Sequence, residues 1–343
     1  MPDQVAEAAV VQEETQAHAA AVAWRAVGAG GPPHEIRILK ERSKGLRKSA
    51  VYWLAGAGPQ GQHIVAKLAQ RAIARHEALV YRSVLAPLRI ATPRLHGVVE
   101  QNERFTWLFL DDAEGEPYDP LADAHRLAAG RWLATLHLGA ARHTGTVLPD
   151  RSLESSIVSL RTGARAIDRI AGHPEFSADE HASLRRTRCA LEVAEGRWAE
   201  VQALAAPLPV TIVHGDFVRK NLRVVGPPGA ASLVAFDWER SGRGSAALDL
   251  AQLEESRRFS ANPCLEAYTE QLRTGGFDVP VAVVERAATV GTILRCLAGV
   301  EWTATSMSPQ WLHDPTADLD VYGVWLERSL RALGLLPRGD RDD

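Results

Sequence analysis

The chain has 343 residues, of which 46% are hydrophobic and 24% are charged, and its formal net charge is −3. This composition is typical of a globular protein with a large core, and the length suggests two domains or lobes. The small net charge gives no reason to expect nucleic acid or an anionic membrane as a partner.

The sequence shows no sign of export or membrane insertion. No segment approaches the roughly 20 apolar residues of a membrane span, and the start lacks the basic and apolar runs of a signal peptide. Three cysteines, Cys189, Cys264 and Cys296, form no CxxC pattern, which favours free thiols in a reducing compartment. We therefore expect a cytoplasmic protein, and we expect it to be a monomer.

The first predicted elements are a helix and three strands. The Ala-rich stretch from Gln4 to Val27 has apolar residues at helical spacing and is followed by a run of Gly and Pro that would end a helix. Apolar and polar residues then alternate in three short segments, which predicts an antiparallel meander. The three segments are Ile36–Ile38, Val51–Trp53 and Ile64–Ala66, and a basic loop, Arg42–Ser49, separates the first two.

A further helix and two strands complete the first half. Arg71–Leu85 has a helical pattern, and Gly97–Glu100 and Phe105–Leu110 are predicted to be strands joined by a polar turn. The next segment, Asp111–Pro120, is polar and contains a glycine and two prolines, so it is predicted to be a linker. We expect residues 1–112 to form a nucleotide-binding lobe with a five-stranded antiparallel sheet, a helix against it and the N-terminal helix.

The second half has a mainly helical pattern. It runs helical from Pro120 to Leu204, with an apolar strand at Val210–Val213 and a hairpin of Leu222–Val225 and Leu233–Phe236. Helices are expected again from Ala247 onward. We therefore predict an α+β protein of two lobes, with residues 113–343 forming a helical catalytic and acceptor-binding lobe that carries a small β-hairpin.

The segment HGDFVRKN, His214–Asn221, carries the strongest chemical signal. It places Asp216 five residues before Asn221, directly after a strand, and Asp237 follows sixteen residues after Asn221 at another strand end. Phosphoryl transfer to a hydroxyl uses a carboxylate that accepts the proton, and carboxylate and amide oxygens that hold Mg²⁺ on the phosphates. The pattern predicts Asp216 as the catalytic base and Asn221 and Asp237 as the metal ligands.

Two residues of the first lobe fit the same chemistry. Lys67 ends the run Ile64-Val-Ala-Lys, and a strand lysine in this context can reach the inner phosphates of ATP. Glu77 lies ten residues later on the predicted helix and can pair with Lys67, which would fix the amine toward the phosphates. The alternative is an ordinary strand lysine and a solvated helix glutamate, but the rest of the pattern favours the functional interpretation.

Several motifs together carry a family resemblance. HGDFVRKN, followed by VAFDWERSGRG and ALDLA, resembles the aminoglycoside phosphotransferase and choline kinase group, a branch of the protein-kinase-like fold. The segment Arg131–His137 also resembles a helix of that group. The resemblance implies a bilobal kinase that uses ATP or GTP and Mg²⁺ on a small-molecule hydroxyl substrate. It implies Asp216 as base, Asn221 and Asp237 as metal ligands, and Lys67 with Glu77 as the phosphate-binding pair.

Other residues are assigned with less support from the sequence. The loop containing Ser43, Lys44 and Gly45 is expected to cover the phosphates, although it has only one glycine where protein kinases use several. The linker at Asp111 is expected to present backbone groups to the purine base, and such groups can recognise ATP or GTP. No activation loop of the protein-kinase type follows Asp237, so a protein substrate is not expected.

Three residues near the motif have alternative interpretations. His214 is predicted to be structural and to hold the loop through hydrogen bonds to backbone carbonyls. Asp249 either supports the catalytic loop or caps a helix, and the sequence does not choose between the two. Glu239 is expected at the surface and not as a second metal ligand.

The acceptor is the part of the function that the sequence leaves open. Acidic residues of the second lobe would complement a cationic antibiotic such as an aminoglycoside, and aromatic residues there would stack on a sugar ring, but a charged helix surface and an apolar core explain them equally well. The acids are Glu254, Glu255, Glu301, Asp314, Asp318 and Asp320, and the aromatic residues are Trp302, Trp311, Tyr322 and Trp325. A kinase inactivating an antibiotic is the first hypothesis, and a metabolic kinase acting on a sugar or amino alcohol is the second. A nucleotide-binding pseudokinase is the third, which the intact Lys67, Asp216, Asn221 and Asp237 argue against.

Overall fold

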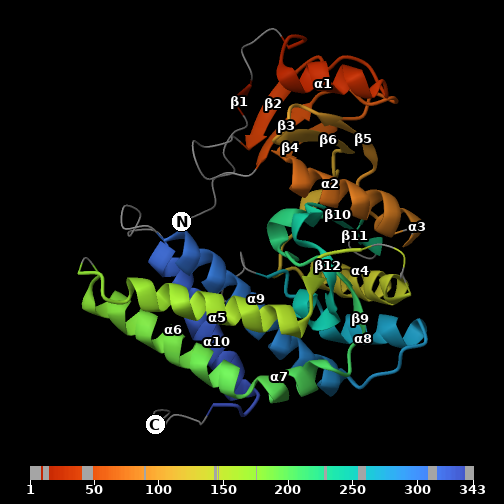
Figure 1. Ribbon diagram of the computed structural model, residues 1–343. Coiled ribbons are helices and arrows are strands. Elements are labelled where there is room, and N and C mark those ends of the chain that lie inside the picture. Colours follow the sequence, from red (N-terminus) through yellow and green to blue (C-terminus); the bar gives the residue numbers. More distant parts are fainter. Residues whose placement is uncertain are drawn as a thin grey trace. The chain divides into compact units, whose positions relative to one another are not determined.

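The computed structural model describes residues 9–10, 15–40, 49–88, 90–142, 145, 147–174, 176–227, 230–253, 260–307 and 315–336 (Figure 1). The chain divides into two compact units. The first comprises Met1–Glu116 and Val234–Glu239, and the second comprises Pro117–Leu233 and Arg240–Asp343. The sequence predicted a boundary after Asp112, and the first segment of the first unit ends at Glu116. The sequence, however, placed Val234–Glu239 in the second lobe, whereas this segment groups with the first unit.

An antiparallel sheet forms the centre of the first unit. Its strand order is β1-β2-β3-β4-β6-β5, and each neighbouring pair is antiparallel. The five predicted strands are all present, as β2 (Ile36–Lys40), β3 (Ser49–Leu54), β4 (Ile64–Gln70), β5 (Leu95–Glu100) and β6 (Phe105–Asp111). The sixth, β1 (Ala9–Val10), pairs with Arg37 and Ile38 of β2.

The prediction of one helix from Gln4 to Val27 is wrong at Ala9 and Val10. These two residues are extended because the outer edge of β2 offers backbone groups that a helix cannot use. The helix that the structure shows is α1 (Ala19–Val27), which begins after His18, whose side chain accepts a hydrogen bond from the backbone N–H of Ala20 at 3.2 Å. Strand pairing therefore overrides the helical propensity of the alanines in this segment.

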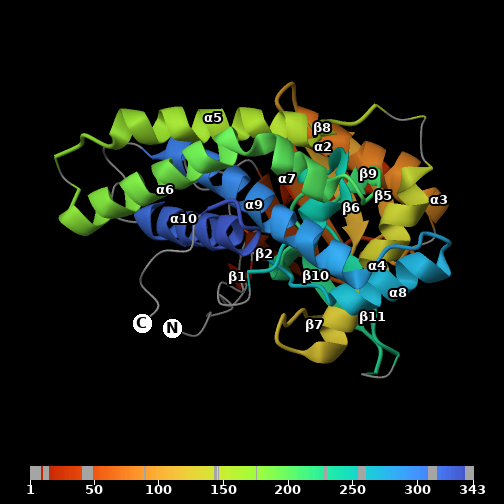
Figure 2. The same ribbon diagram turned by 90° about the horizontal axis from the view of Figure 1, so that it is seen from below.

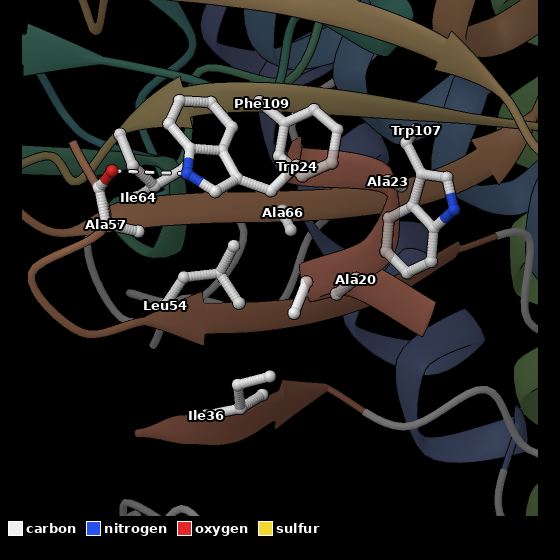
Figure 3. Close-up of a cluster of buried hydrophobic side chains, with 11 residues drawn as sticks. Ala20, Ala23, Trp24, Ile36, Leu54, Ala57, Ile64, Ala66, Trp107 and Phe109 are labelled. Carbon is white, nitrogen blue, oxygen red and sulfur yellow. Dashed lines mark hydrogen bonds between the residues drawn. The ribbon is translucent and has the colours of Figure 1, made fainter. Parts of the chain in front are cut away.

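The two faces of the sheet carry different helices. On one face, Trp24 of α1 packs against Phe109 of β6, and its indole N–H donates to the backbone oxygen of Ala57 at 3.1 Å (Figure 3). Residues alternate between faces along a strand, so Leu108 lies on the opposite face, where it packs against Ala74 of α2 (Arg71–Leu79). The helix predicted over 71–85 continues from α2 through a π-helical turn, Val80–Leu85, and ends in α3 (Ala86–Leu88).

The second unit is mainly helical. Helices α5, α6, α9 and α10 lie side by side in both views, with α9 packed between α5 and α10 (Figures 1 and 2). The helices of this unit are α4 (Asp123–Ala141), α5 (Leu153–Ile170), α6 (Ala178–Gly196), α7 (Trp198–Ala205), α8 (Leu265–Thr274), α9 (Val281–Ser306) and α10 (Pro315–Ala332). Within the described residues, no helix has the length and apolar character needed to cross a bilayer.

The described residues form two further sheets of three strands each. One has the order β8-β12-β9 and contains β8 (Asp150–Arg151), β9 (Val210–Val213) and β12 (Gly242–Ser245). The other has the order β11-β10-β7 and contains β7 (Glu116–Pro117), β10 (Leu222–Val225) and β11 (Ser232–Ala235). The predicted strand and hairpin are present as β9, β10 and β11.

The sequence did not predict β12. Its residues are Gly-Arg-Gly-Ser, which have little strand propensity, and its glycines lie against the backbone of Pro149 and Arg151. The helix expected from Ala247 is also wrong in detail. The chain forms a 3₁₀ turn, Ala246–Leu250, and the next α-helix of the described residues begins at Leu265.

Candidate active site

A buried cluster of charges lies in the first unit. The ammonium of Lys67 on β4 lies 2.7 Å from Oε2 of Glu77 on α2 and 2.5 Å from Oδ1 of Asp237. The side chain of Lys67 is 8% exposed, that of Glu77 is 1% exposed and that of Asp237 is 29% exposed. The ion pair that the sequence predicted between Lys67 and Glu77 is thus formed, and Asp237 shares the same amine.

Local structure explains how these residues meet. Lys67 pairs in register with Leu108, so its side chain is on the face of the sheet that α2 covers. Glu77 lies on the buried side of α2, and its second oxygen accepts a hydrogen bond from the backbone N–H of Trp238 at 3.3 Å. Asp237 follows β11 and has a positive φ of 66°. The segment that carries Asp237 is thereby tied to both Glu77 and Lys67.

Three carboxylates surround the Lys67 ammonium and stabilise its charged form. Burial alone would lower the pKa of Lys67, but Glu77, Asp237 and Glu239 outweigh it and raise that pKa above its ordinary value. Burial raises the pKa of Glu77, and Lys67 opposes the shift. Glu239 was expected at the surface, yet its Oε2 lies 3.7 Å from the Lys67 ammonium and its side chain is partly buried. It is a third carboxylate around the same amine.

In the second unit, Asp216 lies on a tight loop after β9. Gly215 has a φ of +75°, and a Cβ at this position would lie 2.3 Å from the backbone oxygen of Arg240, so only glycine fits. The amide nitrogen of Asn221 donates to the backbone oxygen of Asp216 at 2.9 Å and to its Oδ2 at 3.1 Å. The aspartate and asparagine of the motif are therefore in direct contact.

Asp249 holds this loop in place through hydrogen bonds to its backbone. Its carboxylate accepts hydrogen bonds from the backbone N–H of His214 at 2.7 Å and of Gly215 at 2.9 Å. Its Oδ2 also lies 3.3 Å from Nε2 of His137 on α4, a buried histidine whose Nδ1 is 2.9 Å from the hydroxyl of Tyr268. Of the two interpretations of Asp249, the structure shows support of the loop.

His214 has the structural position that the sequence predicted. Its side chain is buried, and its Nδ1 accepts a hydrogen bond from the backbone N–H of Asp216 at 3.3 Å. This bond runs from a backbone amide to the ring, whereas the sequence predicted bonds from the ring to backbone carbonyls. Together, His214 and Asp249 fix the backbone on both sides of Gly215.

Arg295 of α9 is a residue that the sequence analysis missed. Its Nη1 donates to Oδ1 of Asp216 at 2.8 Å, and the ammonium of Lys220 lies 3.3 Å from Oδ2. Burial alone would raise the pKa of Asp216, but Arg295 and Lys220 together bring that pKa below its ordinary value. A charged residue within the apolar run Ala287–Val300 was the signal that would have pointed to it.

Other predicted site residues are placed differently or not described. Ser43, Lys44 and Gly45 lie outside the described residues. The side chain of Asp111 lies 2.6 Å from Nε2 of His96, and its backbone N–H donates to the oxygen of Arg94 at 2.9 Å. The carboxylate and the backbone N–H of Asp111 thus both form hydrogen bonds within the first unit.

The candidate acceptor residues are divided in the same way. Glu254, Glu255, Asp314 and Trp311 lie outside the described residues. Asp320 of α10 bonds to Ser183 and Arg186 of α6, which makes it a link between helices. Trp302 is exposed, Trp325 packs under Arg328, and Tyr322 is buried. Asp318 and Glu301 are both partly buried.

Asn221 and Asp237 each carry a side-chain oxygen of the kind that binds Mg²⁺. The amide nitrogen of Asn221 is used by Asp216, which leaves the side-chain oxygen as the atom available to a metal. Asp237 contributes a partly exposed carboxylate with one oxygen on Lys67. Mg²⁺ prefers oxygen ligands and is commonly held by one or two carboxylates together with substrate phosphates and water, so the side-chain oxygens of each residue suit it chemically.

The sequence matches a known family over most of its length. The family model of the phosphotransferase enzyme family matches residues 39–282. Among curated proteins, none matches the sequence.

Solved structures share the fold at low sequence identity. The structure of a microcompartment-associated aminopropanol kinase is 15% identical, with a TM-score of 0.61 over 92% of this chain and 98% of that one. A choline/ethanolamine kinase family protein from Mesorhizobium loti is 17% identical, with a TM-score of 0.53 over 86% and 91%. A thermostable mutant of aminoglycoside phosphotransferase APH(4)-Ia, solved with ADP and hygromycin B, is 15% identical, with a TM-score of 0.54 over 90% and 98%. At these identities the similarity establishes the fold.

Proposed function

Because the chain belongs to the phosphotransferase enzyme family and shares the fold of solved small-molecule kinases, we propose the roles of its individual residues in the transfer of phosphate to a small-molecule hydroxyl group. Asp216 is the catalytic base. Asn221 and Asp237 hold Mg²⁺, and Lys67, fixed by Glu77, binds the phosphates of the nucleotide. The observation that carries the proposal is the buried Lys67 amine, which contacts both Glu77 and Asp237. This contact joins the proposed phosphate-binding lysine directly to a proposed metal ligand.

The reaction needs little from the base. The acceptor oxygen forms a bond to the γ-phosphorus, the bond from that phosphorus to the leaving oxygen of ADP breaks, and the hydroxyl proton passes to a carboxylate oxygen of Asp216. Bound Mg²⁺ supplies charge that stabilises the phosphate oxygens. The low pKa of Asp216 keeps it ionised and ready to accept the proton, and the hydrogen bonds of Asp249 keep the loop in place.

Two acceptor classes follow from the sequence, an antibiotic such as an aminoglycoside and a metabolic alcohol such as a sugar or amino alcohol. The proteins named above include an aminopropanol kinase and an enzyme solved with hygromycin B, so the fold accommodates both. The contact between Arg295 and Asp216 favours the metabolic class, because the guanidinium of Arg295 would repel the ammonium groups of a polycationic antibiotic. ATP is the proposed nucleotide, with GTP as the alternative.

Nucleotide turnover tests the proposal directly. Release of ADP or GDP is measured with Mg²⁺ and a set of aminoglycosides, sugars and amino alcohols. We expect at least one acceptor to raise the release of ADP or GDP above the rate with water alone. We expect the Lys67→Met variant to lose that increase. An acceptor-dependent rate that persists in Lys67→Met would contradict the role assigned to this lysine.

A further inference from the structure

A chain of three buried polar side chains runs from α8 to the loop of Asp216. The hydroxyl of Tyr268 on α8 lies 2.9 Å from Nδ1 of His137 on α4. Nε2 of His137 lies 3.3 Å from Oδ2 of Asp249 in the 3₁₀ turn. Tyr268 and His137 are fully buried, and Asp249 is 3% exposed. All three residues belong to the second unit, and Asp249 is the one that bonds to the backbone of the loop.

Close packing of α4 against α8 brings Tyr268 to His137. The two helices lie side by side in both views (Figures 1 and 2). Gly130 of α4 permits this approach, because a Cβ there would lie 2.3 Å from the backbone oxygen of Cys264, the residue before α8. His137 lies about two helical turns after Gly130, so both residues face α8. The rings of His137 and Tyr268 meet edge to face, with their centroids 5.7 Å apart. The position of the Tyr268 hydroxyl is therefore set by helix packing.

The partners of the His137 ring decide which nitrogen carries its proton. A neutral imidazole has one N–H donor and one acceptor nitrogen. The ionised carboxylate of Asp249 only accepts, so Nε2 of His137 donates to it. Nδ1 then accepts, and the hydroxyl of Tyr268 donates to it. The opposite tautomer would place two lone pairs against each other inside the protein, where an unmade hydrogen bond is costly.

Tyr268 disfavours the charged form of the ring. A doubly protonated His137 would donate from Nδ1 to the oxygen of Tyr268, and the hydroxyl proton would then need another acceptor. Within the described part of the chain, His137 is the only hydrogen-bond partner of this hydroxyl. Burial also raises the pKa of Tyr268 above its ordinary value, so the hydroxyl keeps its proton and acts as a donor. The hydroxyl therefore favours a neutral ring with its proton on Nε2.

A proton on Nε2 of His137 completes the set of donors around Asp249. Oδ2 of Asp249 accepts from the backbone N–H of His214 at 2.7 Å and from His137. Oδ1 accepts from the backbone N–H of Gly215 at 2.9 Å. These donors offset the cost of burying the carboxylate and fix its orientation. The backbone oxygen of His137 also accepts from the hydroxyl of Thr211 at 2.8 Å, which ties α4 to the strand before the loop.

We propose that the hydroxyl of Tyr268 keeps His137 neutral, with its proton on Nε2. The neutral ring donates to Asp249 and so holds the loop that positions Asp216. Tyr268 is then a positioning residue, because it acts on Asp216 through two intermediate side chains. The inference rests on the proposed function, since it takes Asp216 as the catalytic base. It deepens that function by assigning a role to a buried tyrosine and a protonation state to a buried histidine.

NMR of the protein with isotope-labelled histidine tests the protonation state directly. The signals of His137 are identified by their loss in the His137→Gln variant. In the wild-type protein at neutral pH we expect a proton on Nε2 of His137 and none on Nδ1. A proton on Nδ1 of the wild-type ring, in the other tautomer or in the charged form, overturns the proposal.

Tyr268→Phe removes the hydroxyl and keeps the ring. We expect kcat for the best acceptor to fall about 2- to 10-fold, the factor that corresponds to loss of one hydrogen bond, with the KM for ATP unchanged. The backbone amide protons of His214 and Gly215 should exchange faster with solvent by a similar factor, which NMR detects without any substrate. Thr269→Val is the matched control, because it removes another buried hydroxyl of α8, one that donates to the backbone oxygen of Leu265. It should leave kcat and both exchange rates at their wild-type values.

A double variant separates action through His137 from packing. The amide nitrogen of Gln can donate to Asp249 without help from Tyr268, so Tyr268→Phe should have no further effect on kcat in the His137→Gln background. If Tyr268→Phe lowers kcat by the same factor in both backgrounds, Tyr268 acts by packing and the inference is wrong. Wild-type kcat and wild-type amide exchange in a folded Tyr268→Phe variant would overturn it as well.

The outcomes for the proposed function are distinct. If the wild-type protein shows no acceptor-dependent ADP release, the proposed function fails. The proton on Nε2 of His137 and the exchange of the two amides then still show whether Tyr268 holds the loop. Thermal unfolding of each variant shows whether it folds, and the NMR result on the wild-type protein decides the proposal if Tyr268→Phe does not fold.

Discussion

The carboxylate of Asp249 accepts a hydrogen bond from the backbone N–H of Gly215 at 2.9 Å. Asp249 is buried, and its second oxygen accepts the preceding amide, that of His214. The two residues before Asp216 are therefore anchored to the 3₁₀ turn Ala246–Leu250 by one charge-assisted bond each.

Removal of Asp249 should damage both stability and activity. Asp249→Ala leaves two backbone amides without their acceptor, and hydrogen bonds to a charged group contribute about 1.5–3 kcal/mol each, so we expect a loss of about 3 kcal/mol in the free energy of unfolding. Urea unfolding measures it. Asp278→Ala is the matched control, because that carboxylate is 86% exposed and its ion pair with Arg273 should contribute less than about 1 kcal/mol. Equal losses in the two variants would contradict the role of Asp249.

Lys67 and Glu77 should be coupled. Lys67→Met leaves the buried carboxylate of Glu77 without its closest cation, which typically destabilises a protein by about 3 kcal/mol. The double variant Lys67→Met/Glu77→Gln removes that buried charge as well and should be more stable than Lys67→Met alone. Chemical unfolding of the two single variants, the double variant and the wild type gives the coupling energy. Additive losses would show that the pair does not interact as the geometry indicates.

Gly215 should not tolerate a side chain. The residue has a positive φ, and a Cβ would overlap the backbone oxygen of Arg240, so we expect Gly215→Ala to cost about 1–3 kcal/mol in stability. Activity should fall with it because Asp216 follows directly. Gly196→Ala in α6 is the control, since nothing lies near its Cβ position and its φ is not positive. A Gly215→Ala variant with wild-type stability and turnover would contradict the loop geometry.

Trp24 should be essential to the first unit. It is buried between α1 and the sheet, and truncation of a buried Trp costs about 3–5 kcal/mol. Trp302→Ala on α9 should change stability by less than about 1 kcal/mol, because that side chain is 53% exposed. Thermal unfolding followed by tryptophan fluorescence and circular dichroism compares the two. If Trp24→Ala unfolds at the wild-type temperature, α1 does not stabilise the sheet.

Local sequence patterns predicted much of this arrangement. Alternation predicted the central strands, and the spacing of Lys67 from Glu77 and of Asp216 from Asn221 identified pairs that are in contact. These pairs are close in sequence and lie on elements whose geometry fixes their separation. A helix that begins at Arg71, directly after the strand of Lys67, or a loop of five residues, leaves few arrangements open.

Contacts between distant segments were not predictable in the same way. Arg295 is 79 residues from Asp216, and the two meet only because α9 packs closely against the 3₁₀ turn, where Gly291 lies against the backbone oxygen of Ala247. The strand β1 depends on the free edge of β2, and Glu239 is drawn inward by Lys67. Each of these features is set by tertiary packing, which overrides local propensity.

The most direct test of the account is the effect of Asp216→Asn on acceptor-dependent ADP release. Asparagine keeps the shape of the side chain but cannot accept the hydroxyl proton as a carboxylate does. We therefore expect turnover of the best acceptor to fall about 10²–10⁴-fold, the usual contribution of a general base, with ATP affinity unchanged. Asp216→Asn with wild-type turnover of that acceptor would contradict the central claim that Asp216 is the catalytic base.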